Sequence, residues 1–210
     1  MEQKIPLFPL SLVPFPGENI NLHIYEPRYI ELFTDILQTN KMFGIPPYIN
    51  KKIEFGTLME VVNVRKKYED GKMDIETRGL KIFKIIKYEN PAKGKQYAVG
   101  YVDYIDNIWN EDPLLKINLL EKLEEFFMLI DEKDAVDLNE NIKCYDFIHK
   151  LALPIEMEYE VLKQNIETNR QELILDYLDH TLPVLQQTMK AKEIIKMNGH
   201  FKYLNPINFH

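Results

Sequence analysis

The chain has 210 residues and a mass of 25.0 kDa, and 45% of its residues are hydrophobic, enough to fill the core of one large or two small domains. The formal charge is −7 and is uneven, because residues 1–110 carry 15 basic and 14 acidic side chains and the remainder carries 11 basic and 19 acidic. This composition excludes a largely disordered chain. It also argues against a nucleic-acid binder with a dominant basic surface, since phosphate contacts supply most of the affinity of such proteins.

Cysteine content and the N-terminal residues predict the compartment. The single cysteine, Cys144, cannot form an intramolecular disulfide or a thiolate metal cluster, which fits a reducing environment. No basic stretch precedes the first apolar residues and no small-residue cleavage site follows them, so we expect no secretion signal. No apolar run approaches the roughly 20 residues of a membrane-spanning helix. The sequence therefore predicts a cytoplasmic protein.

The opening segment, residues 6–17, has the sequence PLFPLSLVPFPG. Prolines fix φ and lack an N–H donor, so this segment is expected to be extended and to lie outside a central strand. Residues 19–24 then alternate polar and apolar side chains, the period of a half-buried strand. A helix is predicted to begin at Pro27, because proline is well tolerated at the first helical position, and its apolar stripe starts at Tyr29.

A β-hairpin is predicted after this helix. Residues 57–68 and 72–78 are rich in β-branched and aromatic side chains, and the Asp-Gly dipeptide at 70–71 between them is typical of a tight hairpin turn. Residues 80–88 and 96–105 follow as two further strands, separated by a loop that contains proline and glycine. Many short strands with one early helix predict a β pseudo-barrel domain over residues 1–107.

The second half of the chain has helical periodicity. Asp112 is placed to cap a helix that begins at Pro113, and apolar residues at i, i+3 and i+4 spacing continue to Ile130. We therefore predict an α-helical bundle domain over residues 108–210. The expected fold class is α+β, with the β pseudo-barrel first.

Three more helices are predicted in this bundle. They cover residues 141–152, residues 156–166, and a longer stretch from 169 towards 197. The last of these contains Pro183, where a backbone hydrogen bond is lost, so we expect the helix to be kinked or broken there.

The opening segment and residues 22–29, LHIYEPRY, resemble the start of the Lon protease N-terminal domain, the substrate-binding module of that protease family. The family pattern is approximately L-P-L-F-P-L-P-L-V-L-F-P-G followed by L-P-L-H-I-F-E-P-R-Y. The departures are Ser11 and Asn21, where the family has proline, Pro14, where it has an aliphatic residue, and Tyr25, where it has phenylalanine. Weaker similarity covers most of the rest of the chain.

The resemblance implies a function as well as a fold. It implies a PUA-like β domain and a non-catalytic module that binds exposed apolar segments of unfolded or damaged proteins. The expected partners are unfolded or misfolded polypeptides, with an ATP-dependent protease or a chaperone as a further candidate in proteolysis or protein quality control. A membrane partner is not expected.

The chemistry of a full-length Lon protease leaves no trace in this sequence. No G-x-x-x-x-G-K-[ST] phosphate-binding loop is present, and the only serine, Ser11, lies in the opening segment rather than on a strand-to-helix turn. The five histidines form no H-x-x-x-H pair and have no ligand-spaced partners. We therefore expect no enzymatic activity, no cofactor and no metal. A hydrolase that uses Ser11 is the weakest hypothesis.

Five residues are candidates for substrate binding: Phe8, Phe15, Glu26, Arg28 and Tyr29. The three aromatic rings either fill the core or offer apolar anchors to a bound peptide. Glu26 and Arg28 are two residues apart at a helix start and are not expected to face one another. Either Glu26 caps the helix and Arg28 pairs with a distant group, or Arg28 donates to the main chain of a captured polypeptide.

An RNA-binding module is the alternative function. Basic residues are frequent on the predicted strands and in the loop between the last two: Arg65, Lys66, Lys67, Lys81, Lys84, Lys87, Lys93 and Lys95. Some PUA-like domains bind RNA, although that is an analogy of fold. Acidic residues lie on the same strands and would reduce the positive potential, so nucleic acid is the less favoured partner.

Overall fold

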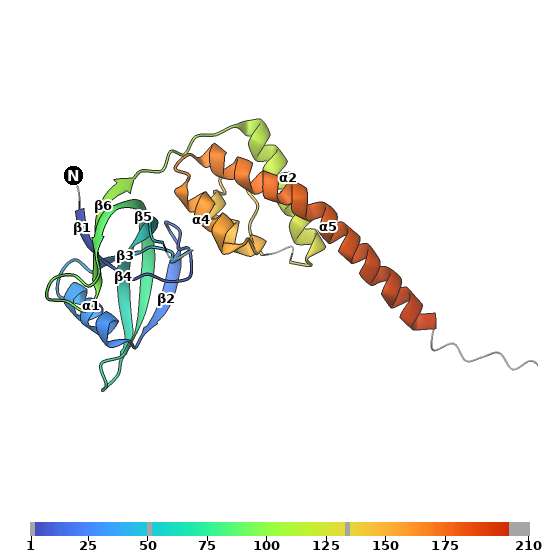
Figure 1. Ribbon diagram of the computed structural model, residues 1–210. Helices are drawn as coiled ribbons and strands as arrows, with labels where there is room; N and C mark the ends of the chain where they lie inside the picture. Colours follow the sequence, from blue (N-terminus) through green and yellow to red (C-terminus); the bar gives the residue numbers. More distant parts are fainter. Residues whose placement is uncertain (1–2, 50–51, 133–134, 202–210) are drawn as a thin grey trace, which may run out of the picture. The chain divides into compact units, whose positions relative to one another are not determined.

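The computed structural model describes residues 3–49, 52–132 and 135–201, with side chains as far as residue 195. Within these residues the fold is α+β, as predicted (Figure 1). The strands are β1 (Gln3–Leu7), β2 (Asn19–Ile24), β3 (Met42–Ile45), β4 (Phe55–Lys67), β5 (Met73–Glu89) and β6 (Ala98–Ile105). The helices are α1 (Pro27–Leu37), α2 (Pro113–Leu129), α3 (Cys144–Phe147), α4 (Ile155–Lys163) and α5 (Glu167–Phe201), with a short 3₁₀ helix η1 (Ile148–Leu151).

The sheet closes on itself through its longest strand. Strand order is β2-β5-β4-β3-β1-β6, and β6 pairs again with β5, so β5, β4, β3, β1 and β6 form a ring of hydrogen-bonded neighbours. The first part of β5 pairs with β2, as in Thr77 with Ile20, and its last part pairs with β6, as in Ile85 with Val102. Strand β5 therefore pairs with β2 and then with β6 along one edge, and with β4 along its other edge.

The predicted hairpin is present, but the expected break after residue 78 is wrong. The β4–β5 turn contains Gly71 with φ of +87°, the backbone conformation that the Asp-Gly dipeptide favours. Strand β5 continues through Gly79, whose N–H donates to Glu18 O and whose carbonyl accepts from Gly17 N–H. A Cβ at Gly79 would lie 2.2 Å from Phe15 O. This glycine marks a close backbone approach and not the end of a strand.

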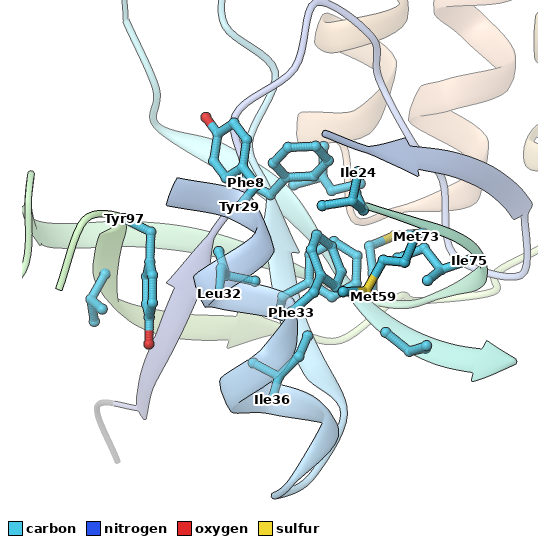
Figure 2. Packing of buried hydrophobic residues seen from close by; sticks show 14 of the residues in the cluster. Phe8, Ile24, Tyr29, Leu32, Phe33, Ile36, Met59, Met73, Ile75 and Tyr97 are labelled. Carbon is cyan, nitrogen blue, oxygen red and sulfur yellow. The ribbon is translucent and has the colours of Figure 1, made fainter. Parts of the chain in front are cut away.

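Helix α1 packs its apolar stripe into the larger core cluster of the sheet (Figure 2). The Phe8 ring lies edge-on to Tyr29 at 4.3 Å between centroids and to Phe33 at 5.6 Å, and Phe33 meets Phe43 at 4.9 Å. These edge-to-face contacts are the favoured geometry for aromatic pairs. The core of this cluster is therefore built around rings from β3, α1 and the opening segment.

The later helices match the prediction in part. Helix α2 begins at Pro113, and the Asp112 carboxylate accepts from the N–H groups of Leu114 and Leu115, as predicted. The helix expected over 141–152 is instead two short turns, α3 and η1. Helix α5 is continuous through Pro183, so of the two expected alternatives the break is wrong and the kink stays a prediction. Pro183 is exposed, so water can satisfy the carbonyl that loses its partner.

The chain forms two compact units, and each is built from two segments. The first unit comprises residues 1–110 and 143–170, and the second comprises 111–142 and 171–210. Independent domains over 1–107 and 108–210 stay a prediction, and so do the PUA-like and helical-bundle descriptions. The observed units differ from those bounds mainly in grouping residues 143–170 with the strands.

A buried ion pair explains this grouping. The Arg170 guanidinium is completely buried; its Nε donates to Glu167 Oε2 at 2.8 Å and its Nη1 donates to Asn107 Oδ1 at 2.9 Å and to the Tyr145 hydroxyl at 2.8 Å. It also lies over the rings of Trp109 and Tyr145. A fully buried cation is tolerated only when it is paired and hydrogen-bonded in this way. Arg170 thus joins the segment after β6 to the returning helices.

Candidate functional site

A groove of about 490 Å³ opens on the first unit beside the start of α1. Four parts of the chain line it. They are the opening segment at Pro9, Leu10 and Ser11, the first turn of α1 at Arg28 and Tyr29, the β3–β4 loop at Tyr48 and Ile53, and the β5–β6 connection with its flanks at Tyr88, Asn90 and Ala98. The volume is in the range of ordinary ligand pockets. We call it the tyrosine groove.

Three of the residues that line the groove are tyrosines: Tyr29, Tyr48 and Tyr88. Tyr48 is 52% exposed and Tyr88 is 50% exposed, so both rings offer apolar surface to a ligand. The ring of Tyr29 is buried against Phe8, and Figure 2 shows its hydroxyl turned away from Leu32 and Phe33. Burial raises the pKa of the Tyr29 hydroxyl, so this group stays a neutral hydrogen-bonding group at ordinary pH.

The ion pair at the start of α1 corrects the sequence prediction. Nε and Nη2 of Arg28 donate to Glu26 Oε2 at 3.0 and 2.8 Å, so the two side chains do face one another. Spacing rules for helices do not apply, because Glu26 is the N-cap residue with extended backbone, φ −75° and ψ 136°. Glu26 makes no side-chain cap hydrogen bond, so the expected capping role is wrong as well.

This pairing fixes the Arg28 side chain at the mouth of the groove. Its guanidinium carbon lies 4.5 Å from the centroid of the Tyr29 ring, a cation–π contact. The pair uses Nε and Nη2, which leaves Nη1 outside it. Arg28 is exposed, so this donor is within reach of a ligand in the groove.

The five predicted substrate-binding residues are separated by the structure. Arg28 and Tyr29 line the groove, and Glu26 supports it through Arg28. Phe8 is buried beneath Tyr29. Phe15 is completely buried and packs against Tyr145 and His149, at centroid distances of 5.0 and 5.2 Å. The role of all five residues in substrate binding stays a prediction. Phe15, however, is completely buried and has no exposed surface that a ligand could contact in this conformation.

Sequence reasoning missed Tyr48 and Tyr88. Both lie beside proline-containing connections, Pro46-Pro47 before Tyr48 and Asn90-Pro91 after Tyr88. A large aromatic residue next to such a connection is a usable signal, because loops lie on the surface and carry binding residues more often than core elements do.

The polar side chains that line the groove belong to serine, asparagine, tyrosine and arginine residues. Ser11 lines it, but no His, Asp, Glu or Lys is present among the lining residues to activate that hydroxyl. Within the described part of the chain, no group of three His, Cys, Asp or Glu side chains could hold a metal ion. The groove presents apolar surface, tyrosine hydroxyls and one guanidinium.

Four of the eight basic residues considered for RNA binding are paired with carboxylates. Lys81 contacts Asp106 at 3.3 Å, Lys84 contacts Glu54 at 3.7 Å and Lys95 contacts Asp35 at 2.6 Å, and Arg65 pairs with Glu76. The Lys95 ammonium lowers the pKa of the Asp35 carboxyl through a side-chain hydrogen bond. These pairs reduce the positive charge that an RNA-binding surface would need.

Comparison with known proteins identifies similar folds and a family. The family model of the ATP-dependent protease La (LON) substrate-binding domain matches residues 4–185. The structure of the Lon N-terminal domain protein from Xanthomonas campestris is 22% identical, with a TM-score of 0.61 over 83% of this chain and 98% of that chain. The N-terminal domain of Mycobacterium avium complex Lon protease is 12% identical, with a TM-score of 0.60 over 84% and 98%. At these identities the structures show a shared fold.

A curated relative matches a smaller part of the chain. Protein cereblon of Xenopus tropicalis is 24% identical over 102 residues, which are 46% of this chain and 23% of that protein. The chain therefore matches about a quarter of the length of that relative. Among the described residues, no helix combines the length and apolar character needed to cross a bilayer.

Proposed function

The chain belongs to the LON substrate-binding domain family, and we propose that its tyrosine groove binds extended, apolar segments of unfolded or damaged polypeptides without catalysing a reaction. The observation that carries this proposal is the grouping of two half-exposed tyrosine rings with Arg28 around an open groove. Tyrosine and arginine are enriched at the residues that dominate binding energy in protein interfaces.

Each part of the groove has a role in this binding mode. Tyr48, Tyr88 and Ile53 provide the apolar surface on which client side chains pack. The Nη1 group of Arg28 donates to a client carbonyl, and Glu26 holds the guanidinium in place. Recognition of apolar rings and main-chain groups requires no particular client sequence, which suits a binder of exposed core segments. Affinity at one groove is modest, because an unfolded client loses conformational entropy when it binds.

We also propose a cellular role in the delivery of bound clients. A PUA-like binding module of this kind would act in the cytoplasm and deliver clients to an ATP-dependent protease or a chaperone. The family assignment supports the substrate-binding role. The pairing of Arg65, Lys81, Lys84 and Lys95 with carboxylates favours polypeptide over RNA as the ligand.

Paired tyrosine variants test the groove. We expect Tyr48→Ala together with Tyr88→Ala to weaken binding of a fluorescently labelled, reduced and carboxymethylated polypeptide by about tenfold or more. The matched control removes two exposed tyrosines outside the groove, Tyr25 and Tyr68, which are 58% and 36% exposed. Circular dichroism confirms that each variant is folded. Equal affinity in the groove variant and the control would remove the tyrosine groove from the binding site.

A further inference from the structure

A second groove, of about 680 Å³, lies on the second unit along α2. We call it the α2 groove. Its apolar lining comes from one face of α2 and from the segment that follows: Ile117, Leu120, Phe127, Met128, Val136 and Leu138. Its lining residues lie between 117 and 128 and between 136 and 138, and all of them belong to the second unit.

The exposed apolar side chains of α2 exceed what its own packing needs. The helix buries Leu119, Leu123, Phe126 and Phe127 in the second unit. Yet Leu114 is 80% exposed, Ile117 is 54% exposed and Met128 is 50% exposed. Apolar residues gathered along one helix in this way mark an interaction surface more often than scattered single residues do.

Carboxylates run through the same surface. Glu121, Glu124 and Asp137 also line the α2 groove, and no lysine or arginine is present among its lining residues. Two lysines of α2 are engaged elsewhere, since Lys122 pairs with Asp179 and Lys116 donates to Ile142 O. The groove is therefore apolar and negatively charged at once, and a low-dielectric wall strengthens the field of such charges.

The spacing along α2 defines the shape of a partner. Ile117, Glu121, Glu124 and Met128 follow at i, i+4, i+7 and i+11, so apolar and acidic side chains share one stripe. This stripe spans eleven residue steps, or about 17 Å at the rise of an α-helix. A partner helix of about three turns covers that length.

We propose that the α2 groove binds a basic amphipathic helix of a partner protein, with leucine-like side chains on the apolar lining and lysine or arginine opposite Glu121, Glu124 and Asp137. Charge complementarity selects this partner: an acidic helix would be repelled, and an uncharged apolar helix would leave three carboxylates partly desolvated and unpaired. An amphipathic helix in an apolar groove is a common mode of peptide recognition. The α2 groove and the tyrosine groove share no lining residue and lie on different units.

The test uses the full chain and designed peptides as probes. A labelled 15-residue helical peptide of leucine and lysine, its leucine-to-alanine counterpart and its lysine-to-glutamate counterpart are titrated by fluorescence anisotropy. We expect binding of the leucine–lysine peptide only, weakened severalfold between 50 and 300 mM salt because charge pairs contribute. Equal binding of the alanine–lysine peptide would overturn the proposal, because it would show attraction by charge alone. So would failure of the leucine–lysine peptide to bind.

Charge reversal locates the site. Glu121→Lys with Glu124→Lys is expected to weaken binding of the leucine–lysine peptide at least tenfold. The control, Glu172→Lys with Glu193→Lys, makes the same change in net charge at two exposed positions of α5 outside the groove, and it should change affinity less than twofold. Equal losses in both variants would show that net charge, and not the α2 groove, attracts the peptide. A Tyr48→Ala and Tyr88→Ala variant that retains this binding separates the result from that for the tyrosine groove.

Discussion

Helix α1 of the first unit and helix α2 of the second begin alike, since each has proline at its first position. They differ in what they leave in solvent. Helix α1 places its large apolar side chains in the core and leaves none of them exposed, whereas α2 leaves Leu114, Ile117 and Met128 at least half exposed. The apolar residues of α1 are therefore accounted for by folding. Those of α2 exceed what folding requires, and the proposed binding surface on α2 rests on that excess.

The largest expected effect is in α1. Phe33 is completely buried and contacts both Phe8 and Phe43, so Phe33→Ala should lower the free energy of unfolding by about 3–5 kcal/mol. Denaturant unfolding measures the change. Thr34→Ala, at an exposed position of the same helix, should change it by less than about 0.5 kcal/mol. A small loss for Phe33→Ala would mean that α1 isn't the centre of this core.

Arg170 is a charged residue of the first unit that is as completely buried as Phe33. Arg170→Ala should cost about 3–5 kcal/mol, because it leaves the carboxylate of Glu167 buried without its cation. The change should also expose more of the Trp109 ring, which is 47% exposed with Arg170 against it, and so shift the fluorescence of the single tryptophan to longer wavelength. An unchanged spectrum with unchanged stability would show that this ion pair does not hold residues 143–170 in the first unit.

A smaller effect is expected at His149. Its ring nitrogens contact Glu158 at 2.8 Å and Glu18 at 3.2 Å, and these hydrogen bonds raise the pKa of the imidazole to about 10. Because the pKa is raised on folding, the stabilisation is full below the usual value near 6.5 and is lost as pH rises through about 10. The side chain is 39% exposed, which limits the contribution to about 1 kcal/mol.

The comparison of wild type with His149→Gln isolates this group from others that titrate. We expect the difference in their free energies of unfolding to be largest near pH 6 and to shrink as pH approaches 10.5. Denaturant titrations at four pH values measure it. A difference that stays constant across this range would contradict the proposed protonated state of His149.

The smallest effect on stability is expected on the exposed face of α2. Leu114→Ser with Ile117→Ser should change the free energy of unfolding by no more than about 0.5 kcal/mol, because neither residue is buried in the core, Leu114 being 80% and Ile117 54% exposed. Binding of the leucine–lysine peptide should fall in the same variant. A loss of stability comparable to that of Phe33→Ala would show that these residues belong to the core, and the contrast between α1 and α2 would fail.

Local signals in the sequence predicted several elements closely. Alternation identified β2, Pro27 and Pro113 marked the helix starts, and Asp112 capped α2 as its position indicated. These predictions succeed because the controlling interactions lie within a few residues of one another. The turn of the β4–β5 hairpin belongs to the same class, since it needs only a glycine with positive φ.

Features that depend on distant residues could not be predicted in the same way. Gly79 looks like a strand end, but it accommodates the backbone of Phe15, which lies more than sixty positions earlier in the chain. Periodicity cannot distinguish a buried ring such as Phe15 from an exposed ring such as Tyr88, because packing partners decide the difference. The tyrosine groove draws on four separate parts of the chain, so only the closed sheet brings its residues together.

Binding of the wild-type protein to an unfolded chain tests the central proposal most directly. Fluorescence anisotropy would be measured with a labelled, reduced and carboxymethylated polypeptide, a folded protein and a single-stranded RNA, each across a salt series. Apolar capture depends weakly on salt, whereas phosphate contacts weaken steeply as salt rises. We predict binding to the unfolded polypeptide alone, retained at high salt. Binding to RNA alone, lost as salt rises, or no binding to the unfolded polypeptide, would contradict the proposed function.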